Sequence, residues 1–222
     1  MPIGTFCVRY VKLGPGEALR CNWGPGSTVS DLNWEEADLQ EVQWRRETFE
    51  HANFRHVRWD GAEIRGCRFL SCDFTGSTFN GATIKDSFFA ACEWRWTRFF
   101  GAHLIDLKMT GNSLDQADLA GIVIRGGDWS STRLRYQVLS RQDFSGMQWK
   151  DADFYGADLS GVNFQSADLT RAVFAKTNLR DADLRGAEVD GINWAVVDLC
   201  RVILDQAQAI HVVRSLGAQV MD

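Results

Sequence analysis

The sequence predicts an all-β solenoid, a right-handed quadrilateral β-helix of about nine coils with a short C-terminal α-helix. Three observations predict this fold. Every fifth residue from Trp34 to Leu204 is apolar, at all 35 positions and without a skip. We call these residues the large residues of the repeats. The residue two places before each large one is small or apolar in 30 of the 35 repeats and is Ala in 12. Two places after the large residue stand 13 of the chain's 20 glycines.

A period of five fits neither an α-helix, which needs apolar residues near every 3.6 positions, nor a flat strand, which needs them at every second. Two inward residues in each five require the chain to turn once per repeat. The glycine-rich position lies at the turn, because a residue without Cβ adopts unusual backbone angles at little cost. Four turns close a square coil, so residues four repeats apart stack on one face at the sheet spacing.

The chain divides into three parts. Residues 1–30 do not repeat and contain two Gly-Pro-Gly turn signals. We expect a short strand near residues 6–11 and a cap over the N-terminal end of the solenoid. Residues 31–205 carry the repeat, and residues 206–222 form a helix with a tail.

The C-terminal segment places apolar residues at helical spacing, with Gly217 as the C-cap. This stripe covers the last coil or joins a second chain, and we expect a homodimer through this end, with a cap alone as the alternative. A second apolar edge, Val212 with Ile203, leaves further surface for another chain. The predicted dimerisation residues are Leu204, Ala207, Ile210, Val213 and Leu216.

Composition narrows the class of protein. The chain is 45% hydrophobic with a formal net charge of −5, which favours a soluble protein and argues against direct binding of nucleic acid. We see no signal peptide and no run long enough for a membrane helix. The six Cys show no zinc-like spacing. We therefore expect a cytoplasmic protein with reduced thiols and no membrane contact.

No arrangement of residues indicates catalysis. The four His do not converge with other ligands, so we expect no metal and no cofactor. Cys67, Cys72 and Cys92 occupy the small inward position, where a thiol acts as a small hydrophobe. Catalytic carboxylates need a concave, desolvated site, which a convex rod does not offer. We expect a binding protein, not an enzyme.

The pattern at the inward position two places before the large residue is broken at five residues. These are Glu47, Asn112, Gly127, Gln137 and Gln142. Three of these failures lie between residues 127 and 142, where Val138 also occupies a normally polar position. The large residues keep their register throughout. We therefore expect a distorted coil or bulge here, and no domain boundary.

Two features of the surface are candidates for partner binding. Carboxylates recur in columns on two faces, although Asp in this slot also bonds turn amides. The predicted acidic residues are Asp118, Asp128, Asp151, Asp158, Asp168, Glu188, Asp190 and Asp198. A candidate aromatic contact patch consists of Phe88, Trp96 and Phe100, which occupy outward positions.

The repeat reads Ala-Asp-Leu or Ala-Asp-Phe at residues 117–119, 152–154, 157–159, 167–169 and 182–184. This motif resembles the consensus of the pentapeptide-repeat family over about residues 31–205. Trp at seven of the large positions departs from the usual Leu or Phe; these are Trp34, Trp44, Trp59, Trp94, Trp129, Trp149 and Trp194.

A continuous repeat followed by a terminal helix looks like the family members that give resistance to quinolones and albicidin. That resemblance implies a dimeric, DNA-mimicking acidic rod that binds DNA gyrase or topoisomerase IV, and either inhibits the enzyme or protects it from antibiotics that poison it. The alternative is a general interaction scaffold or effector whose partner is unrelated to DNA. The aromatic residues between Phe88 and Ile105 favour that alternative.

Overall fold

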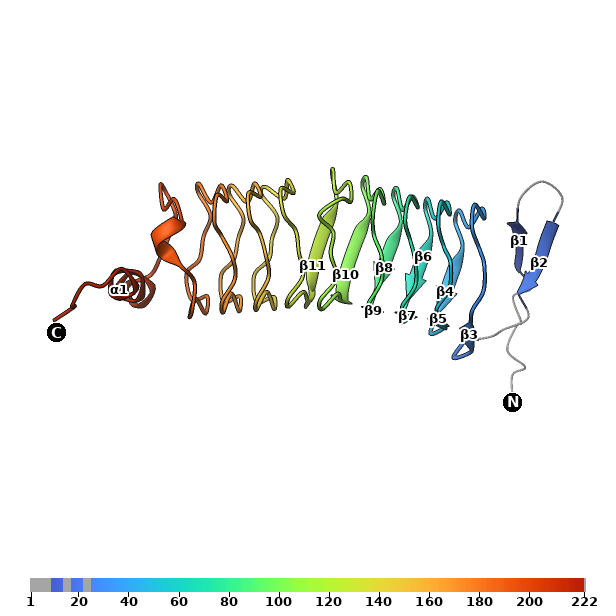
Figure 1. Cartoon of the computed structure of the whole chain (residues 1–222), viewed down its shortest axis with the longest axis horizontal. Helices are drawn as coiled ribbons and strands as arrows, with labels where there is room; N and C mark the ends of the chain where they lie inside the picture. The colour runs from blue at the N-terminus through green and yellow to red at the C-terminus, as the bar shows by residue number, and fades with distance from the viewer. Residues whose placement is uncertain (1–8, 14–16, 22–24, 222) are drawn as a thin grey trace.

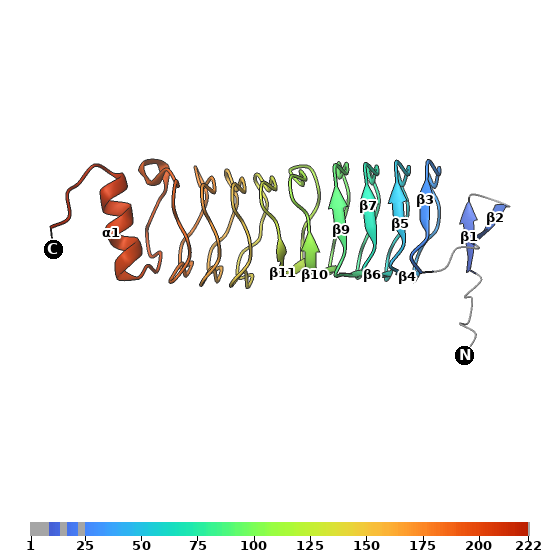
Figure 2. The ribbon, with the colours of Figure 1, turned by 90° about the horizontal axis from the view of Figure 1, so that it is seen from below.

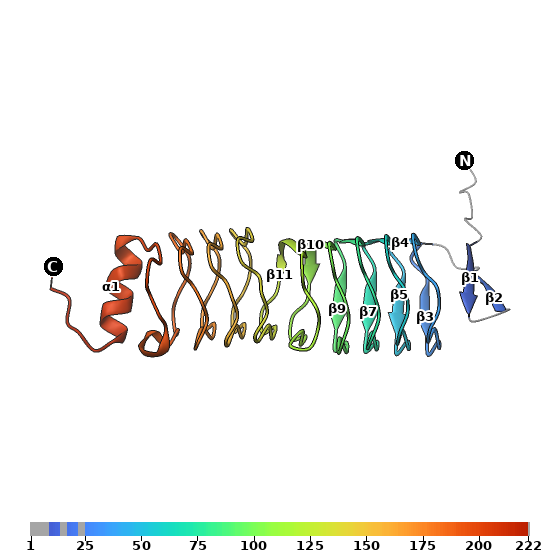
Figure 3. The same ribbon diagram turned by 90° about the horizontal axis from the view of Figure 1, so that it is seen from above.

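The computed structural model describes residues 9–13, 17–21 and 25–221. The chain forms one rod of stacked square coils, a right-handed quadrilateral β-helix with a helix at its C-terminal end (Figure 1). Views from below and above show the same row of coils along the rod (Figures 2 and 3). The fold class predicted from the five-residue period is confirmed.

The described N-terminal residues form a hairpin of two antiparallel strands, β1 (Arg9–Leu13) and β2 (Glu17–Cys21). The predicted strand near residues 6–11 overlaps β1 from Arg9 onward, and its first residues lie outside the described part. The coils begin at β3 (Thr28–Ser30), slightly before the predicted boundary, because Val29 already occupies a large position.

The coils pair in parallel, each residue with the one four repeats later, as in Phe49↔Phe69. Regular strands extend from Thr28 to Asp128, which is about five turns of the solenoid. Single bridges with the same separation continue to Asp183↔Ile203. Strand-bearing turns are therefore fewer than the nine coils expected. The strands are β4 (Gln43–Arg45), β5 (Thr48–Glu50), β6 (Glu63–Arg65), β7 (Arg68–Leu70), β8 (Thr83–Lys85), β9 (Phe88–Ala90), β10 (His103–Lys108) and β11 (Val123–Asp128).

Each coil has four faces, which we number by their large residues. Face 1 carries every twentieth residue from Trp34, face 2 from Leu39, face 3 from Trp44 and face 4 from Phe49. Faces 1 and 3 are opposite, as are faces 2 and 4, because they lie half a coil apart. The corner residue two places after the large one has a positive φ at every corner from 31 to 191 except Gln116.

The core fills the inside of the coils. All seven Trp at large positions are buried, with 3% exposure at most. In neighbouring coils, aromatic rings stack on one another, for example Phe54 on Phe74 at 5.2 Å and Phe69 on Phe89 at 4.8 Å between ring centroids. The period of five therefore builds columns of buried side chains with runs of stacked rings, and their burial stabilises the rod.

The stacking is interrupted on face 1. The bridge Asp73↔Glu93 is followed next by Ser113↔Arg133, and no bridge joins Glu93 to Ser113 in the described part of the chain. The Asn112 side chain lies at this break: its Oδ1 accepts from the Cys92 backbone N at 3.3 Å. An inward residue that breaks the sequence pattern therefore lies where the ladder is open.

A second interruption lies on faces 2 and 3, one coil later. The bridge Arg98↔Asp118 is followed next by Val138↔Asp158. Here Gln137 Nε2 donates to the Ala117 carbonyl at 3.1 Å, and Gln142 Nε2 donates to the Ile122 carbonyl at 2.8 Å. The distortion expected between residues 127 and 142 is present, and inward amides compensate the backbone groups that it leaves without partners.

The C-terminal end has a 3-10 turn at Trp194–Val196 (η1), followed by α1 (Gln206–Ser215). Asp205 is the N-cap of α1 and forms a capping box with Gln208. Gly217 follows the helix with φ of 90°, as expected of a glycine just beyond a helix end.

Candidate interaction surfaces

Five of the eight predicted acidic residues gather on face 4 and its corner in the C-terminal half. Parallel bridges join Asp128 to Gln148, Gln148 to Asp168 and Asp168 to Glu188, so this column is continuous across the coils. We name this surface the acidic strip; it consists of Asp128, Asp151, Asp168, Glu188 and Asp190.

The acidic strip carries a net negative charge. At the outward and corner positions of face 4 from 128 to 191, five carboxylates stand against Lys150 and Arg171, which leaves −3. Arg171 Nε binds Asp151 Oδ1 at 2.6 Å. The hydrogen bond from Arg171 lowers the pKa of Asp151, so this carboxyl is charged at neutral pH. The strip is an anionic surface with one internal ion pair.

Two carboxylates of the strip also support the backbone. Asp128 Oδ1 accepts from the Ser130 backbone N at 3.0 Å, and Asp168 Oδ1 accepts from the Thr170 backbone N at 2.9 Å. These are the turn contacts that Asp makes two residues ahead. Each contact uses one oxygen, so the residue holds its turn and still contributes charge to the surface.

The other three predicted acidic residues lie on the opposite face, face 2. Each accepts a hydrogen bond from the backbone N two residues later, at 2.9–3.1 Å. At the outward and corner positions of face 2 from 118 to 201, four carboxylates stand against three arginines, which leaves −1. Face 2 is therefore nearly neutral, with Asp118, Asp158, Asp181 and Asp198 set against Arg141, Arg180 and Arg201.

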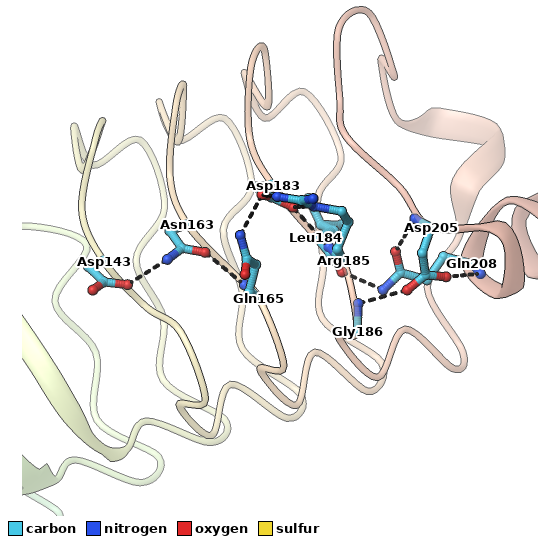
Figure 4. Close-up of polar contacts among 9 residues, drawn as sticks. All are labelled: Asp143, Asn163, Gln165, Asp183, Leu184, Arg185, Gly186, Asp205 and Gln208. Atoms are coloured by element: carbon cyan, nitrogen blue, oxygen red, sulfur yellow. Dashed lines mark hydrogen bonds and ion pairs between the residues drawn. The ribbon is translucent and has the colours of Figure 1, made fainter.

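The C-terminal end of the rod is covered by polar contacts as well as apolar ones (Figure 4). Gln208 Nε2 donates to the carbonyls of Leu184 and of Ala187, the latter at 2.9 Å. Asp205 Oδ2 accepts from the Gly186 backbone N at 2.8 Å. Backbone N–H groups of Gln208 and Gly186 lower the pKa of Asp205. The helix thereby provides partners for backbone groups that a further coil would otherwise bind.

One expectation about which side of α1 is exposed is wrong. Val212, predicted to stay free for a partner, is buried at 5% exposure against the last coil. Val213 and Leu216 remain exposed, at 43% and 55%. Ala207 is exposed, while Leu204 and Ile210 are half-buried. The helix turns its Gln208–Val212 side to the rod because the capping box at Asp205 sets its direction.

The predicted aromatic patch is divided by the fold. Phe88 lies on face 4 in β9, with the Arg68 guanidinium 4.8 Å from its ring centroid. Phe100 lies on face 2, half a coil away, and is 65% exposed. Trp96 lies at the corner between faces 1 and 2 and is 64% exposed. Phe88 is therefore not part of one patch with the other two.

Two further apolar side chains stand on the Trp96 side of the rod. Tyr136 is 68% exposed at the same corner, two coils after Trp96, and Val138 on face 2 is 65% exposed. The period alone places Tyr136 in the Trp96 column, which is the signal that sequence reasoning did not use. We name Trp96, Phe100, Tyr136 and Val138 the aromatic corner.

The cysteines at the inward positions are core residues. Cys67, Cys72 and Cys92 are free and buried. Burial, together with the nearby Glu47 carboxylate, raises the pKa of Cys67 to about 12, so its thiol is protonated and unreactive at neutral pH. Within the described residues, no group of three or more His, Cys, Asp or Glu is arranged to hold a metal ion. No described helix is long and apolar enough to cross a membrane.

Comparison with known proteins identifies the repeat. The family model for pentapeptide repeats matches in eight copies, over residues 48–81, 138–175 and 177–212. A comparison with curated proteins found no match.

Several solved structures are similar to the chain. One is a trypsin-treated form of QnrB1, described as a plasmid-mediated fluoroquinolone resistance protein, with 22% identity over 88% of this chain and 100% of that chain and a TM-score of 0.49. Another is HetL of the cyanobacterium Nostoc sp. strain PCC 7120, involved in heterocyst differentiation regulation, with 23% identity over 79% and 84% and a TM-score of 0.41. A third is a pentapeptide repeat protein of the Arabidopsis thaliana thylakoid lumen, with 14% identity over 80% and 75% and a TM-score of 0.13.

The unbroken five-residue period, the square coils that it forms and the matched repeats agree with one another. The chain belongs to the pentapeptide-repeat family.

Proposed function

We propose that this protein is a DNA-mimicking binding protein that engages a type II topoisomerase, DNA gyrase or topoisomerase IV, through the acidic strip. It would inhibit the enzyme or protect it from antibiotics that poison it. The observation that supports this proposal is the strip itself, five carboxylates with a net charge of −3 along one side of a rod. Such a surface is complementary to a basic groove that otherwise holds DNA phosphates.

The dimensions of the rod are compatible with this role. Coils stack at about 4.8 Å, so about nine coils extend for about 43 Å. Duplex DNA rises about 3.4 Å per base pair along its axis, and the rod therefore has the length of about 12 base pairs. The topoisomerase itself is taken from the resemblance of the repeat and terminal helix to quinolone- and albicidin-resistance proteins.

A supercoiling assay with charge-neutral variants tests the proposal. In the strip variant, Asp128→Asn, Asp168→Asn and Glu188→Gln remove three charges while each side chain keeps an acceptor oxygen. The matched control on face 2 carries Asp118→Asn, Asp158→Asn and Asp198→Asn. We expect wild type to inhibit gyrase supercoiling or to restore it in the presence of a quinolone, and the strip variant to need roughly tenfold more protein.

The control variant should behave like wild type, because its charges lie on the nearly neutral face. Equal activity of the strip and control variants would show that the strip is not the contact. If wild type, at any excess, neither inhibits gyrase or topoisomerase IV nor protects them from a quinolone or albicidin, the topoisomerase assignment is wrong.

The homodimer is part of the same proposal. Val213 and Leu216 present apolar surface at the end of the rod, and a second copy would remove it from water. Sedimentation equilibrium tests this: wild type should sediment as a dimer, and the double variant Val213→Lys, Leu216→Lys as a monomer. The control places two lysines at exposed coil residues instead, Ala120→Lys and Ser145→Lys. A monomeric wild type at all concentrations would contradict the dimer.

A second candidate function is a general interaction scaffold with a partner unrelated to DNA. The observation that favours it is the aromatic corner, whose four apolar side chains are each 64% exposed or more. In this case Trp96→Ala would abolish partner binding, and the strip variant would leave it unchanged.

A further inference from the structure

The break on face 1 opens a cavity on the surface of the rod. Its volume is about 560 Å³, within the range of small binding sites. We name it the face 1 groove; its lining includes Cys92, Glu93, Trp94, Ser113, Asp115 and Gln116. None of its lining residues belongs to the acidic strip.

The walls of the groove present backbone groups that have lost their partners. On either side the regular pattern holds: Phe74 N donates to Glu93 O at 2.9 Å, and Leu114 N donates to Arg133 O at 2.9 Å. The equivalent bonds from Trp94 N to Ser113 O and from Ser113 N to Cys92 O are not made in the described part of the chain. An N–H and a C=O therefore face the gap from each wall.

The groove is closed on its inner side. Asn112 Oδ1 accepts from Trp94 Nε1 at 3.0 Å, and Asn112 Nδ2 donates to Phe89 O at 3.0 Å and to Met109 O at 2.9 Å. Both Asn112 and Trp94 are 2% exposed. The core stays covered although the ladder is broken, so the break is a built feature of the coil.

The chain path at the end of the groove is also changed. One coil earlier at this corner, Gly76 N donates to Arg95 O, the carbonyl just before the next corner residue. Trp96 N instead donates to the carbonyl of the corner residue itself, Gln116 O, at 3.0 Å. Gln116 is the one corner from 31 to 191 without a positive φ. The groove therefore ends at the corner that carries Trp96. Tyr136 lies at the same corner, one coil beyond Gln116.

The charges of the walls cancel. Arg95 Nε lies 3.7 Å from Glu93 Oε2, and Arg133 Nε lies 3.4 Å from Asp115 Oδ2. A wall of paired charges offers no net attraction to a phosphate or a nucleic acid. Unpaired N–H and C=O groups on two parallel walls match the backbone of an extended peptide, which bonds at both of its edges.

We propose that the face 1 groove binds an extended peptide segment of a partner protein, which adds as a strand between the two coils. The peptide backbone bonds Trp94 N and Cys92 O on one wall and Ser113 N and O on the other, in place of the missing coil contacts. Its inward side chains are small, because Asn112 and Trp94 close the floor. A larger apolar side chain at its end lies against Trp96.

The first test uses a phage-displayed library of random heptapeptides, selected on wild type, on Ser113→Trp and on Ser160→Trp. Ser113→Trp fills the groove, whereas Ser160 is an equally half-buried serine on face 2, outside the breaks. We expect peptides with small residues at alternate positions to be enriched on wild type and on Ser160→Trp. Affinity of the synthetic peptides for Ser113→Trp should fall at least about tenfold.

The second test uses wild type alone and does not depend on the folding of a variant. Hydrogen exchange is measured with and without a saturating selected heptapeptide. The amides of Trp94 and Ser113 should exchange at least about tenfold more slowly in the complex, because each gains a hydrogen bond. Failure to enrich any peptide, equal binding to Ser113→Trp, or unchanged exchange at these two amides would each overturn the proposal. None of these results depends on topoisomerase activity.

Discussion

Among the buried tryptophans, the indole N–H has a partner at some positions and none at others. Trp94 Nε1 donates to Asn112 at 3.0 Å and Trp129 Nε1 donates to the Gly126 carbonyl at 3.2 Å. The indole N–H groups of Trp59, Trp149 and Trp194 have no hydrogen-bond partner in the described part of the chain. A buried donor without a partner costs about 1–3 kcal/mol, so these three are retained for the volume that they fill.

A pair of substitutions separates the two cases. Trp59→Phe removes an unpaired donor, which offsets part of the lost volume. Trp94→Phe loses the same volume and also leaves Asn112 Oδ1 without its indole partner. We expect Trp94→Phe to cost about 1–2 kcal/mol more than Trp59→Phe in urea unfolding. Equal costs would mean that the contact with Asn112 adds no stability.

Trp96 combines a strained backbone with an exposed side chain. Its φ is 57°, in the left-handed region that costs a residue with Cβ about 1–2 kcal/mol. We expect Trp96→Gly to raise the free energy of unfolding by about 1 kcal/mol, because little packing is lost from a side chain that is 64% exposed. Such a gain would indicate that this Trp serves binding and not the stability of the fold.

Gly101→Ala is the control for this corner strain. Gly101 has φ of 66°, and an added Cβ would meet no heavy atom within 4 Å, so only the backbone conformation changes in cost. We expect it to lower stability by about 1 kcal/mol. If Trp96→Gly were destabilising while Gly101→Ala behaved as expected, Trp96 would have a packing role that its exposure does not suggest.

Among the elements, α1 closes the rod through one side chain above all. Gln208→Ala would leave the carbonyls of Leu184 and Ala187 without their amide donor in a buried place. We expect a loss of about 1–3 kcal/mol. Gln206→Ala, on the exposed first turn of the same helix, should change stability by less than about 0.5 kcal/mol. Thermal unfolding measures both, and similar losses would contradict the capping role.

Face 3 contains a carboxyl whose ionisation stabilises the stack. Asp183 binds Arg185 Nη2 and Gln165 Nε2, each at 2.6 Å (Figure 4). The hydrogen bond from Arg185, with those from the Arg185 backbone and Gln165, lowers the pKa of Asp183 from 3.8 to about 2. A folded-state pKa below the unfolded one means that this stabilisation is present above pH 3.8 and is lost as the pH falls through about 2.

Acid unfolding of wild type and Asp183→Asn measures this contribution. At pH 6 wild type should be more stable by up to about 2 kcal/mol, and the difference should shrink towards zero as the pH falls to about 2. A difference that stays constant with pH would show that the charge of Asp183 is not what stabilises this end of the rod.

The whole molecule distributes charge unevenly between opposite faces, with −3 along the strip on face 4 and −1 on face 2. Such asymmetry orients the rod as it approaches a basic partner, over distances up to the Debye length. We therefore expect the association rate with gyrase to fall at least about tenfold as the ionic strength rises from about 0.01 M to about 0.15 M. Surface plasmon resonance measures this rate, and the strip variant should show a weaker dependence. Equal salt dependence of wild type and strip variant would exclude steering by the strip.

The aromatic corner and the C-terminal helix show what the sequence pattern predicted about the surface and what it did not. Position within the repeat predicted that Trp96 and Phe100 point outward, and they do. It did not separate Phe88 from them, because distance along the chain says little when half a coil reverses the direction of a side chain. The spacing predicted a helix within residues 206–222 that ends at Gly217, and α1 spans Gln206–Ser215, but the exposed side was decided by the Asp205 cap and by Gln208 reaching the last coil.

The sequence by itself determined the coil: a large residue every fifth position, a small one two places earlier and a permissive corner leave the backbone no other regular path. It also marked Asn112, Gln137 and Gln142 as exceptions. Only the tertiary structure decided that these amides lie where the ladder opens, and that Trp94 N and Ser113 O there have no mutual bond. The reason is physical: the five-residue pattern controls how one coil turns, whereas bonding between coils depends on segments four repeats apart meeting in space.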